Sequence, residues 1–388
     1  MSIDDSQVTA AVAHVDDPEL RRPLGELGMV GEVRSRRKKA TVEVALPVAH
    51  YPQIDELVGR VRAAAARVDG VDEVVVDTVV MDEEARARLR MLLRGDAVDG
   101  GTMHAPDDGH DHGTALGHEE GRSNKFMEPR SKTRILGISS GKGGVGKSSV
   151  TVNLAVALAR SGYDVGILDA DVYGFSVPKM LGVTTDPLII GDLVVPPTAN
   201  GVRCLSMGFF VADDTPVIWR GPMLHKALEQ FLVDAYWGEP DFLLIDMPPG
   251  TGDVTLSLGQ YLTKTEVFVV TTPQPAAQRV AQRSAYAARK LKLAVRGVIE
   301  NMSWFTGDDG TRYELFGAGG GQQLADEIGV PLMGRIPLVP ALREGGDVGI
   351  PVVVDDPDGE AAAVFAQLAA TIASLGPARV YRRELTVR

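Results

Sequence analysis

The sequence predicts a doubly wound α/β domain with a mostly parallel sheet, preceded by a small α+β domain. In residues 131–376, short apolar runs alternate with stretches of helical spacing. Such runs, bounded by Gly, Pro and Asp, are typical of strands that are buried on both faces of a parallel sheet. In residues 1–95, half-buried strand patterns alternate with helical patterns, which predicts the smaller domain.

The small domain is expected to contain three helices and two strands. The alternation of apolar and polar residues in ATVEVAL predicts a half-buried strand, and apolar residues at helical intervals predict the helices. The expected helices are Val8–Val15, Ile54–Val68 and Asp82–Arg94, and the expected strands are Ala40–Leu46 and Val71–Met81.

Residues 96–130 separate the two domains and are rich in Gly, Asp and His. They lack apolar periodicity and cannot bury enough surface to offset the entropy of ordering, so we expect a disordered linker. Its histidines and aspartates either capture a divalent metal or simply keep a polar tether solvated. The residues concerned are His104, His110, His112, His118, Asp107, Asp108 and Asp111.

The larger domain is expected at residues 131–376, followed by a basic tail at residues 377–388. Ligands of doubly wound folds bind at the carboxyl ends of the strands, and polar motifs of this chain follow several of its predicted strands. The predicted strands are Ile135–Ile138, Val165–Leu168, Phe242–Ile245, Val267–Thr271, Val295–Ile299 and Leu332–Ile336.

Composition limits the class of function. The formal net charge of -12 argues against non-specific binding to nucleic acid, which needs a positive surface. The start of the sequence lacks the basic and apolar segments of a signal peptide, and no apolar run is long enough to span a bilayer. We therefore expect a cytoplasmic protein without a membrane span. The single cysteine, Cys204, excludes an internal disulfide.

The first predicted strand of the larger domain leads into GKGGVGKS, which fits the phosphate-binding pattern G-x-x-x-x-G-K-[ST]. Glycines allow backbone N–H groups to converge on phosphate oxygens, and the N-terminus of the following helix adds positive charge. Lys147 is expected to reach the β and γ phosphates of ATP, and Ser148 to bind Mg²⁺. The expected ATP-binding residues of this loop are Gly141, Lys142, Gly143, Gly144, Val145, Gly146, Lys147, Ser148 and Ser149.

Acidic residues follow two of the predicted strands. Of the pair after Val165–Leu168, we expect Asp171 to orient the attacking water. Asp169 is expected either to support Mg²⁺ and the loop lysine or to cap the following turn. Asp246 follows Phe242–Ile245 and is expected to contact Mg²⁺ directly or through water.

Two further polar positions have alternative interpretations. The segment MPPGTGD, which follows Asp246, is expected to sense the γ-phosphate through its backbone amides. Asp253 is either part of this switch or the N-cap of the next helix. Asn301 either reads the adenine edge, since its amide offers a donor and an acceptor, or simply ends a strand.

The second lysine of the phosphate loop, in the form KGGVGKS, resembles the deviant Walker ATPases, which include partitioning, septum-positioning and nitrogenase-iron-protein ATPases. The resemblance implies a homodimer with two ATP molecules between the subunits. It also implies that Lys142 reaches across the interface to the nucleotide of the other subunit. The expected catalytic residues are then Lys142, Lys147 and Asp171.

Longer strings resemble the Mrp-type (ApbC) iron–sulfur cluster carrier ATPases over most of residues 130–375. They include LDADVYGFSVPKMLG, DFLLIDMPPGTGDVTLSLGQ, IENMSWF and RIPLVPALREGGDVGIPVV. In the small domain, DPE at residues 17–19 and LGMV at residues 27–30 resemble a domain shared by iron–sulfur assembly factors. The resemblance implies a carrier that holds a labile [4Fe–4S] cluster between two protomers and passes it to apo-proteins, with ATP turnover required for transfer. The implied partners are a second copy, apo iron–sulfur client proteins and assembly factors.

The chain departs from this family pattern in its cysteines. Where the family usually places a C-x-x-C pair, residues 305–311 read FTGDDGT, and Tyr51 stands where the small domain typically has a cysteine. Thiolate is the usual ligand of cluster iron, and Cys204 lies in an apolar segment that predicts an inert buried thiol. The iron–sulfur ligands are therefore unknown. Two other functions stay open: an ATP-gated adaptor without its own cluster, and a partitioning or positioning ATPase that binds DNA or membrane.

Overall fold

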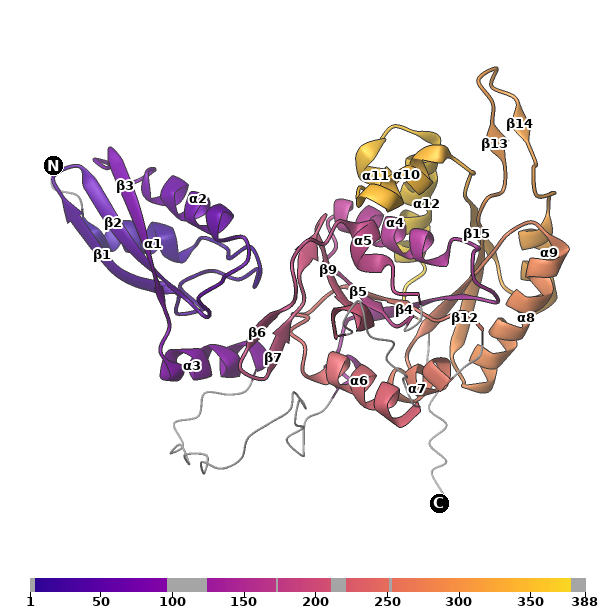
Figure 1. Ribbon diagram of the computed structural model, residues 1–388, viewed down its shortest axis with the longest axis horizontal. Coiled ribbons are helices and arrows are strands. Elements are labelled where there is room, and N and C mark those ends of the chain that lie inside the picture. The colour runs from indigo at the N-terminus through magenta and orange to yellow at the C-terminus, as the bar shows by residue number, and fades with distance from the viewer. Residues whose placement is uncertain (1–3, 96–123, 172–173, 211–220, 251–252, 378–388) are drawn as a thin grey trace. The chain divides into compact units, whose positions relative to one another are not determined.

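The computed structural model describes residues 4–95, 124–171, 174–210, 221–250 and 253–377 (Figure 1). These residues form two compact units. The first unit contains the described residues up to 95 and two later segments, residues 187–195 and 234–238. The second unit contains the rest of the described chain. None of the helices in these ranges has both the length and the apolar character needed to cross a bilayer.

The first unit is built around a three-stranded sheet in the order β1-β2-β3. β2 pairs antiparallel with β1 and parallel with β3, so α2 carries the crossover between β2 and β3. Alternate side chains of β2 are buried, and they pack in one core with residues of α1 and α2. The elements are α1 (Asp5–Ala13), β1 (Val30–Arg36), β2 (Lys39–Leu46), α2 (Ile54–Ala65), β3 (Glu73–Val80), α3 (Glu83–Arg94), β6 (Leu188–Ile190) and β7 (Leu193–Val195).

The elements expected in the small domain are present, with ends that differ by a few residues. α1 begins earlier than expected because the Asp4 side chain accepts a hydrogen bond from Ser6 N and caps the helix. Asp82 caps α3 in the same way, through Ala85 N. β1 was not expected, because its side chains are half-buried or exposed and give no alternating apolar pattern.

The second unit contains a sheet with the strand order β15-β12-β11-β4-β10-β5-β9-β8. All neighbours in this sheet pair in parallel except β8 and β9. This arrangement confirms the predicted doubly wound α/β fold. The strands are β4 (Arg134–Ser140), β5 (Val165–Asp169), β8 (Thr198–Ala199), β9 (Val202–Ser206), β10 (Phe242–Asp246), β11 (Glu266–Thr271), β12 (Ala294–Glu300) and β15 (Leu332–Arg335), with a separate hairpin of β13 (Phe305–Thr306) and β14 (Arg312–Tyr313). The helices are η1 (Lys125–Met127), α4 (Lys147–Arg160), α5 (Val177–Leu181), η2 (Met207–Phe210), α6 (Gly221–Val233), α7 (Asp253–Tyr261), α8 (Pro275–Lys290), α9 (Gly320–Ile328), α10 (Pro340–Val348), α11 (Val352–Asp355) and α12 (Glu360–Ser374).

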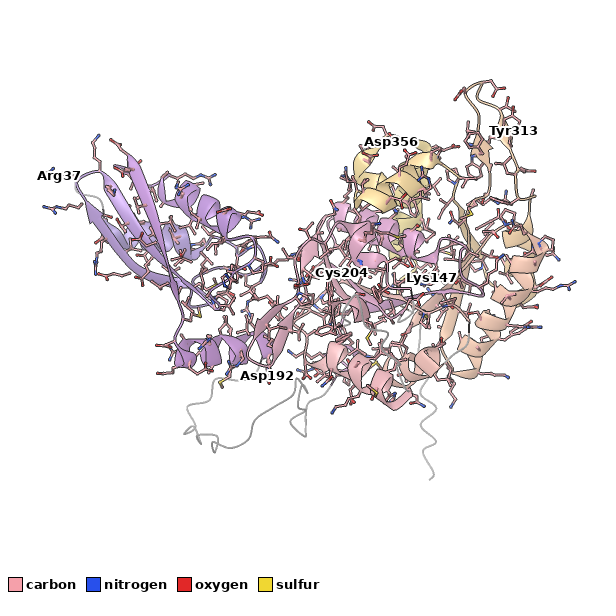
Figure 2. All side chains as sticks on the ribbon, in the orientation of Figure 1. Arg37, Lys147, Asp192, Cys204, Tyr313 and Asp356 are labelled. Carbon is pink, nitrogen blue, oxygen red and sulfur yellow. The ribbon has the colours of Figure 1, made fainter. Side chains whose placement is uncertain are left out.

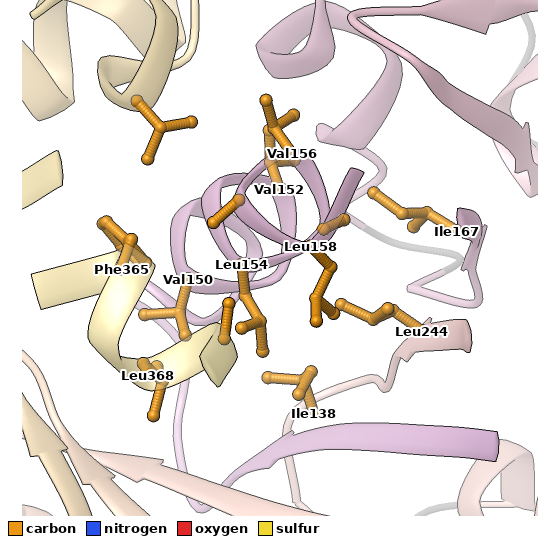
Figure 3. Packing of buried hydrophobic residues seen from close by; sticks show 14 of the residues in the cluster. Ile138, Val150, Val152, Leu154, Val156, Leu158, Ile167, Leu244, Phe365 and Leu368 are labelled. Atoms are coloured by element: carbon orange, nitrogen blue, oxygen red, sulfur yellow. The ribbon is translucent and has the colours of Figure 1, made fainter. Parts of the chain in front are cut away.

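Helices cover both faces of the large sheet, and β11 shows how the strands are shared between them. Phe268 and Val270 belong to the core that includes α4 and α12, whereas Val267 and Val269 belong to the core that includes α8 and α9. Figure 3 shows the first of these cores, with α4 side chains between the sheet and α12. Because both faces are buried, the strands read as continuous apolar runs, which is why they could be predicted.

Part of the segment expected to be a linker is described. Residues 124–130 contain η1, whose Phe126 side chain is buried, and Asn124 Nδ2 donates a hydrogen bond to Tyr261 O. Residues 96–123, which carry the four histidines and the aspartates of the predicted metal-capturing segment, lie outside the described residues. The arginines of the C-terminal tail, residues 378–388, also lie outside them.

Candidate nucleotide-binding site

The phosphate loop connects the central strand β4 to α4, at the carboxyl edge of the sheet. At two positions of the loop, neighbouring atoms lie so close to the backbone that only glycine fits. A Cβ atom on Gly141 would lie 2.2 Å from the backbone of α8, and one on Gly146 would lie 2.2 Å from Asn301 Nδ2. Gly146 also has a φ of 80°, in the left-handed region that favours glycine, and it directly precedes α4. The backbone amides that follow therefore point out of the helix N-terminus toward the loop.

Lys147 and Ser148, at the start of α4, meet the carboxylate of Asp246 at the end of β10. Lys147 Nζ lies 2.6 Å from Asp246 Oδ2, and the Ser148 hydroxyl donates to the same oxygen over 2.6 Å. Lys147 and Asp246 are both buried. The structure therefore brings together the lysine, hydroxyl and carboxylate that the sequence placed in two separate motifs.

Thr151 was not recognised from the sequence as part of this site. Its hydroxyl lies 2.6 Å from Asp246 Oδ1, so both oxygens of that carboxylate are engaged. Thr151 follows Lys147 by one helical turn, and the i, i+4 spacing could have indicated that both face the same neighbour.

Asp169 is the register partner of Asp246 on the adjacent strand β5. Its carboxylate accepts hydrogen bonds from Asp171 N, Val177 N and the Ser206 hydroxyl, at 3.2, 3.3 and 3.0 Å. Burial, and then the negative charge of Asp246, raise the pKa of Asp169 to about 7. This geometry corresponds to the turn-capping alternative for Asp169, because its oxygens hold the backbone that leads into α5.

Asp171 lines a pocket of about 400 Å³ together with the phosphate loop. Its Oδ2 lies 3.7 Å from Lys147 Nζ. The other side chains and backbone segments of the wall come from the phosphate loop, from the start of α5 and from the segment after β10. The residues are Ser140, Lys142, Gly143, Gly144, Gly146, Lys147, Ser148, Ser149, Gly174, Ser176, Met180 and Pro249.

Lys142 is exposed at the mouth of this pocket. In the described part of the chain, no hydrogen bond or ion pair involves its ammonium group. Its backbone carbonyl accepts a hydrogen bond from the Ser140 hydroxyl, which fixes the loop at this point. The two lysines of the loop therefore differ in environment: Lys147 is buried and paired, whereas Lys142 is free to reach outward.

Asn301 lies behind the phosphate loop, where its Nδ2 donates to Val145 O over 2.9 Å. Its Oδ1 is buried and has no hydrogen-bond partner within the described residues. A second pocket of about 210 Å³ begins at this side chain and is lined mainly by apolar groups from the segment after β15 and from α10. The lining residues include Met180, Met302, Pro337, Leu338, Val339 and Leu342. Polar side chains of Ser149, Arg343 and Asp347 also line this pocket. A mainly apolar slot with a few polar groups suits a flat heterocycle that carries an amino group.

The segment after Asp246 is tied to the strand that precedes the phosphate loop. Met247 N donates to Ile138 O, and Gly250 N donates to Ser140 O over 3.0 Å. Pro249 lines the larger pocket. Asp253 is the first residue of α7, and residues 251–252 lie outside the described part of the chain.

Cys204 lies in the middle of β9 with an exposed fraction of 0% (Figure 2). Burial raises the pKa of its thiol, so the thiolate is disfavoured. Within the described residues, no group of three or more His, Cys, Asp or Glu side chains is arranged to hold a metal ion.

Comparison with known proteins identifies the family. The model of the NUBPL iron-transfer P-loop NTPases matches residues 131–373, more than half of the chain. The chain belongs to this family. The phosphate loop, Asp169, Asp171, Asp246 and Asn301 all fall within the matched region. A second family model, described as iron–sulfur cluster assembly protein, matches residues 5–76 of the small domain.

Several relatives match this chain over most of its length. An iron–sulfur cluster carrier protein of Mycobacterium bovis is 44% identical over 358 residues, which is 90% of this chain and 88% of the relative. One of Bacillus subtilis is 40% identical over 345 residues, covering 87% and 88%. Among solved structures, a nucleotide-binding protein of Archaeoglobus fulgidus in complex with ADP matches with a TM-score of 0.52 and 33% identity, over 60% of this chain and 93% of that chain.

Proposed function

We propose that this chain binds and hydrolyses Mg·ATP as a homodimer and uses turnover to deliver iron–sulfur clusters to apo-proteins. The observation that carries the proposal is the meeting of Lys147, Ser148 and Asp246 beside a glycine loop and a pocket at the carboxyl edge of the sheet. The relatives that are named iron–sulfur cluster carrier proteins support the choice of cargo.

In this proposal, different residues of the pocket bind the phosphates, hold Mg²⁺ and orient the attacking water. Backbone amides of the glycine loop and Lys147 bind the phosphate oxygens, and Ser148 and Asp246 would hold Mg²⁺. When bound, Mg²⁺ neutralises charge on the phosphates. Asp169 holds the turn that positions Asp171 in this proposal, because its own oxygens are already occupied. Asp171 orients the attacking water, since its carboxylate lines the pocket near Lys147.

The base binds in the smaller pocket in this proposal. The Asn301 Nδ2 is used by Val145 O, which leaves Oδ1 to accept a hydrogen bond from an exocyclic amino group. Adenine has such a donor, whereas guanine presents a carbonyl oxygen at the equivalent position. Because an unpaired buried acceptor is costly, this arrangement favours ATP over GTP.

The dimer is supported by two features of the described surface. Lys142 is exposed beside the nucleotide pocket, and its ammonium group has no partner among the described residues, as expected of a residue that completes the site of a second subunit. Large apolar side chains are also exposed on this domain, at Phe175, Phe210, Met223 and Leu256.

Sedimentation of the wild type with and without Mg·ATP should show ATP-dependent dimers. Lys142→Ala should bind ATP as a monomer yet lose dimer-dependent phosphate release, and equal loss of binding in Lys142→Ala and Lys147→Ala would exclude the cross-subunit role.

A second candidate function is favoured by the cysteine content. Cys204 is the only cysteine and is fully buried in β9, so its thiol cannot bind a surface cluster without disrupting this strand. In this second candidate function the cargo cluster takes its ligands from other proteins, and the chain acts as an ATP-gated adaptor between assembly factors and clients. Iron and sulfide analysis after anaerobic reconstitution distinguishes the two functions. Stable loading of the purified wild type supports the carrier, whereas absence of loading, together with ATP-dependent capture of an apo-client, supports the adaptor.

A further inference from the structure

The two segments of the larger domain that join the first unit form one continuous patch. β6 and β7 make an antiparallel hairpin, with Leu188 opposite Val195, and the turn contains Gly191 at a φ of 66°. The later segment lies beside the hairpin, because Val194 N donates to Asp234 O and Tyr236 N donates to Val194 O, at 3.1 and 2.7 Å. We call residues 187–195 and 234–238 the docking patch.

One face of the docking patch is part of the core of the small domain. Its buried side chains belong to the same apolar cluster as residues of α3 and of the segment after α1. The Tyr236 hydroxyl also donates to Leu20 O over 3.3 Å. The patch contributes Leu188, Ile190, Leu193, Val195 and Tyr236, and the small domain contributes Leu20, Leu24, Leu89 and Leu93. On the opposite face of the hairpin, Ile189 is 44% exposed, whereas its register partner Val194 is buried.

Charged groups fix the edge of this contact. Asp192, in the turn of the hairpin, lies 2.5 Å from an Arg94 nitrogen and 3.9 Å from an Arg90 nitrogen. A Cβ atom on Gly191 would lie 2.7 Å from Arg90 Nη1, so α3 approaches the turn closely. These ion pairs are partly exposed, so they orient α3 against the turn but add little to the free energy of folding. The buried apolar side chains provide most of the stabilisation.

The patch is joined to the nucleotide site by a short stretch of chain. Residues 182–186 separate it from α5, and α5 begins at Val177, whose backbone N–H donates to Asp169. Ser176 and Met180 from this segment line the nucleotide pocket. The covalent route from α5 to the hairpin is therefore short, and it is the route by which a shift of α5 against a bound triphosphate would reach the hairpin in the proposal below.

We propose that the docking patch is a surface dedicated to holding the small domain, and that occupancy of the nucleotide site changes how tightly the small domain is held. This inference rests on the proposed function, because it requires that the pocket bind Mg·ATP. It assigns the small domain a role that responds to the nucleotide, with β6, β7 and α3 as the connection. The small domain then presents its surface to client proteins differently in the two nucleotide states.

Hydrogen exchange of the full chain with and without Mg·ATP tests the proposal. In the wild type, ATP should slow exchange in the phosphate loop and change exchange in α5, the hairpin and α3 by about threefold or more. Ile190→Ala removes a buried side chain of the patch, so it should raise basal exchange in α3 and abolish the ATP effect there, while the phosphate loop stays protected. The matched control Ile189→Ala, which removes an exposed side chain of the same strand, should behave as the wild type.

The outcomes separate this proposal from the proposed function. Protection of the phosphate loop without any ATP effect in α3 of the wild type overturns the coupling and leaves ATP binding intact. Identical behaviour of Ile190→Ala and Ile189→Ala overturns the docking role. No protection of the phosphate loop overturns both proposals. If Ile190→Ala does not fold, Asp192→Lys replaces it: its α3 should lose the ATP effect, the exposed control Asp69→Lys should keep it, and an unchanged effect in Asp192→Lys overturns the docking role.

Discussion

At the level of single residues, the site depends on the carboxylate of Asp246, which is contacted by Lys147, Ser148 and Thr151. Asp246, Lys147 and Ser148 occupy fixed places in sequence motifs, so their use at one site could be predicted. Thr151 and Ser206 could not, because a threonine in a helix and a serine at a strand end have many uses. The role of Thr151 depends on how α4 packs against β10, and that of Ser206 on the register of β5 and β9, neither of which can be read from the sequence.

The role of Asp171 can be tested by removing its charge and keeping its size. Asp171→Asn should retain Mg·ATP binding but lower steady-state phosphate release about 100-fold or more, since orientation and activation of water contribute on that scale. Asp186→Asn, an exposed change of the same kind, is the control. Unchanged phosphate release in Asp171→Asn would assign the attacking water to another group.

Glu19 provides a pH-dependent test in the small domain. Burial, and then the charge of Asp17, raise its pKa from 4.5 to about 7. The folded state therefore holds a proton that the unfolded state releases, and the associated stability is present below pH 4.5 and lost as the pH rises through about 7. Between these values the free energy of unfolding of the wild type should fall relative to that of Glu19→Gln.

Urea titrations at several pH values, followed through hydrogen exchange of peptides from β2, measure this difference in stability. Asp69→Asn, at an exposed position of the same domain, should follow the pH dependence of the wild type. A constant difference between the wild type and Glu19→Gln across this range would show that Glu19 is already ionised in the folded protein.

At the level of elements, the strands that could be predicted from the sequence are those that are buried on both faces. The central strands of the large sheet are buried on both faces and read as apolar runs, so they were located from the sequence. β1 is half-exposed, and β6 and β7 have three residues each, too few to show a period. The docking patch could therefore not be predicted from the sequence. It has few apolar residues, and these pack against the N-terminal domain, which is distant in the sequence.

The C-terminal helix α12 is attached to the sheet by a buried charge cluster that predicts a large effect of mutation. Glu266 pairs with Arg134 at 2.9 Å and with Arg296 at 3.1 Å, and Arg134 also donates to Ile372 O near the end of α12. Glu266→Ala leaves two arginines without their carboxylate and should lower the free energy of unfolding by about 3–5 kcal/mol.

Urea or thermal unfolding measures this effect. The exposed pair of Arg343 and Glu344 provides the control, since Glu344→Ala should cost less than about 1 kcal/mol. A loss in Glu266→Ala as small as that in Glu344→Ala would show that the cluster contributes little to stability.

At the level of the whole molecule, the chain combines a nucleotide-binding unit with a small unit whose core includes segments from the middle of the sequence. A prediction from sequence treats each domain as one continuous stretch. A segment such as residues 187–195, which lies in the middle of the chain but packs with the N-terminal domain, is recognised only in the three-dimensional structure. The family match over residues 131–373 and the small-domain match over residues 5–76 describe the two parts separately. The docking patch indicates how they can work together.

The central claim is that the loop between β4 and α4 binds a magnesium-bound triphosphate through Lys147. Isothermal titration calorimetry of the full chain with Mg·ATP tests this claim most directly. The account predicts one site per chain in the wild type and affinity lowered by about 100-fold or more in Lys147→Ala, since a charge-assisted contact with phosphate is lost. Absence of binding in the wild type, or equal affinity in Lys147→Ala, would contradict it.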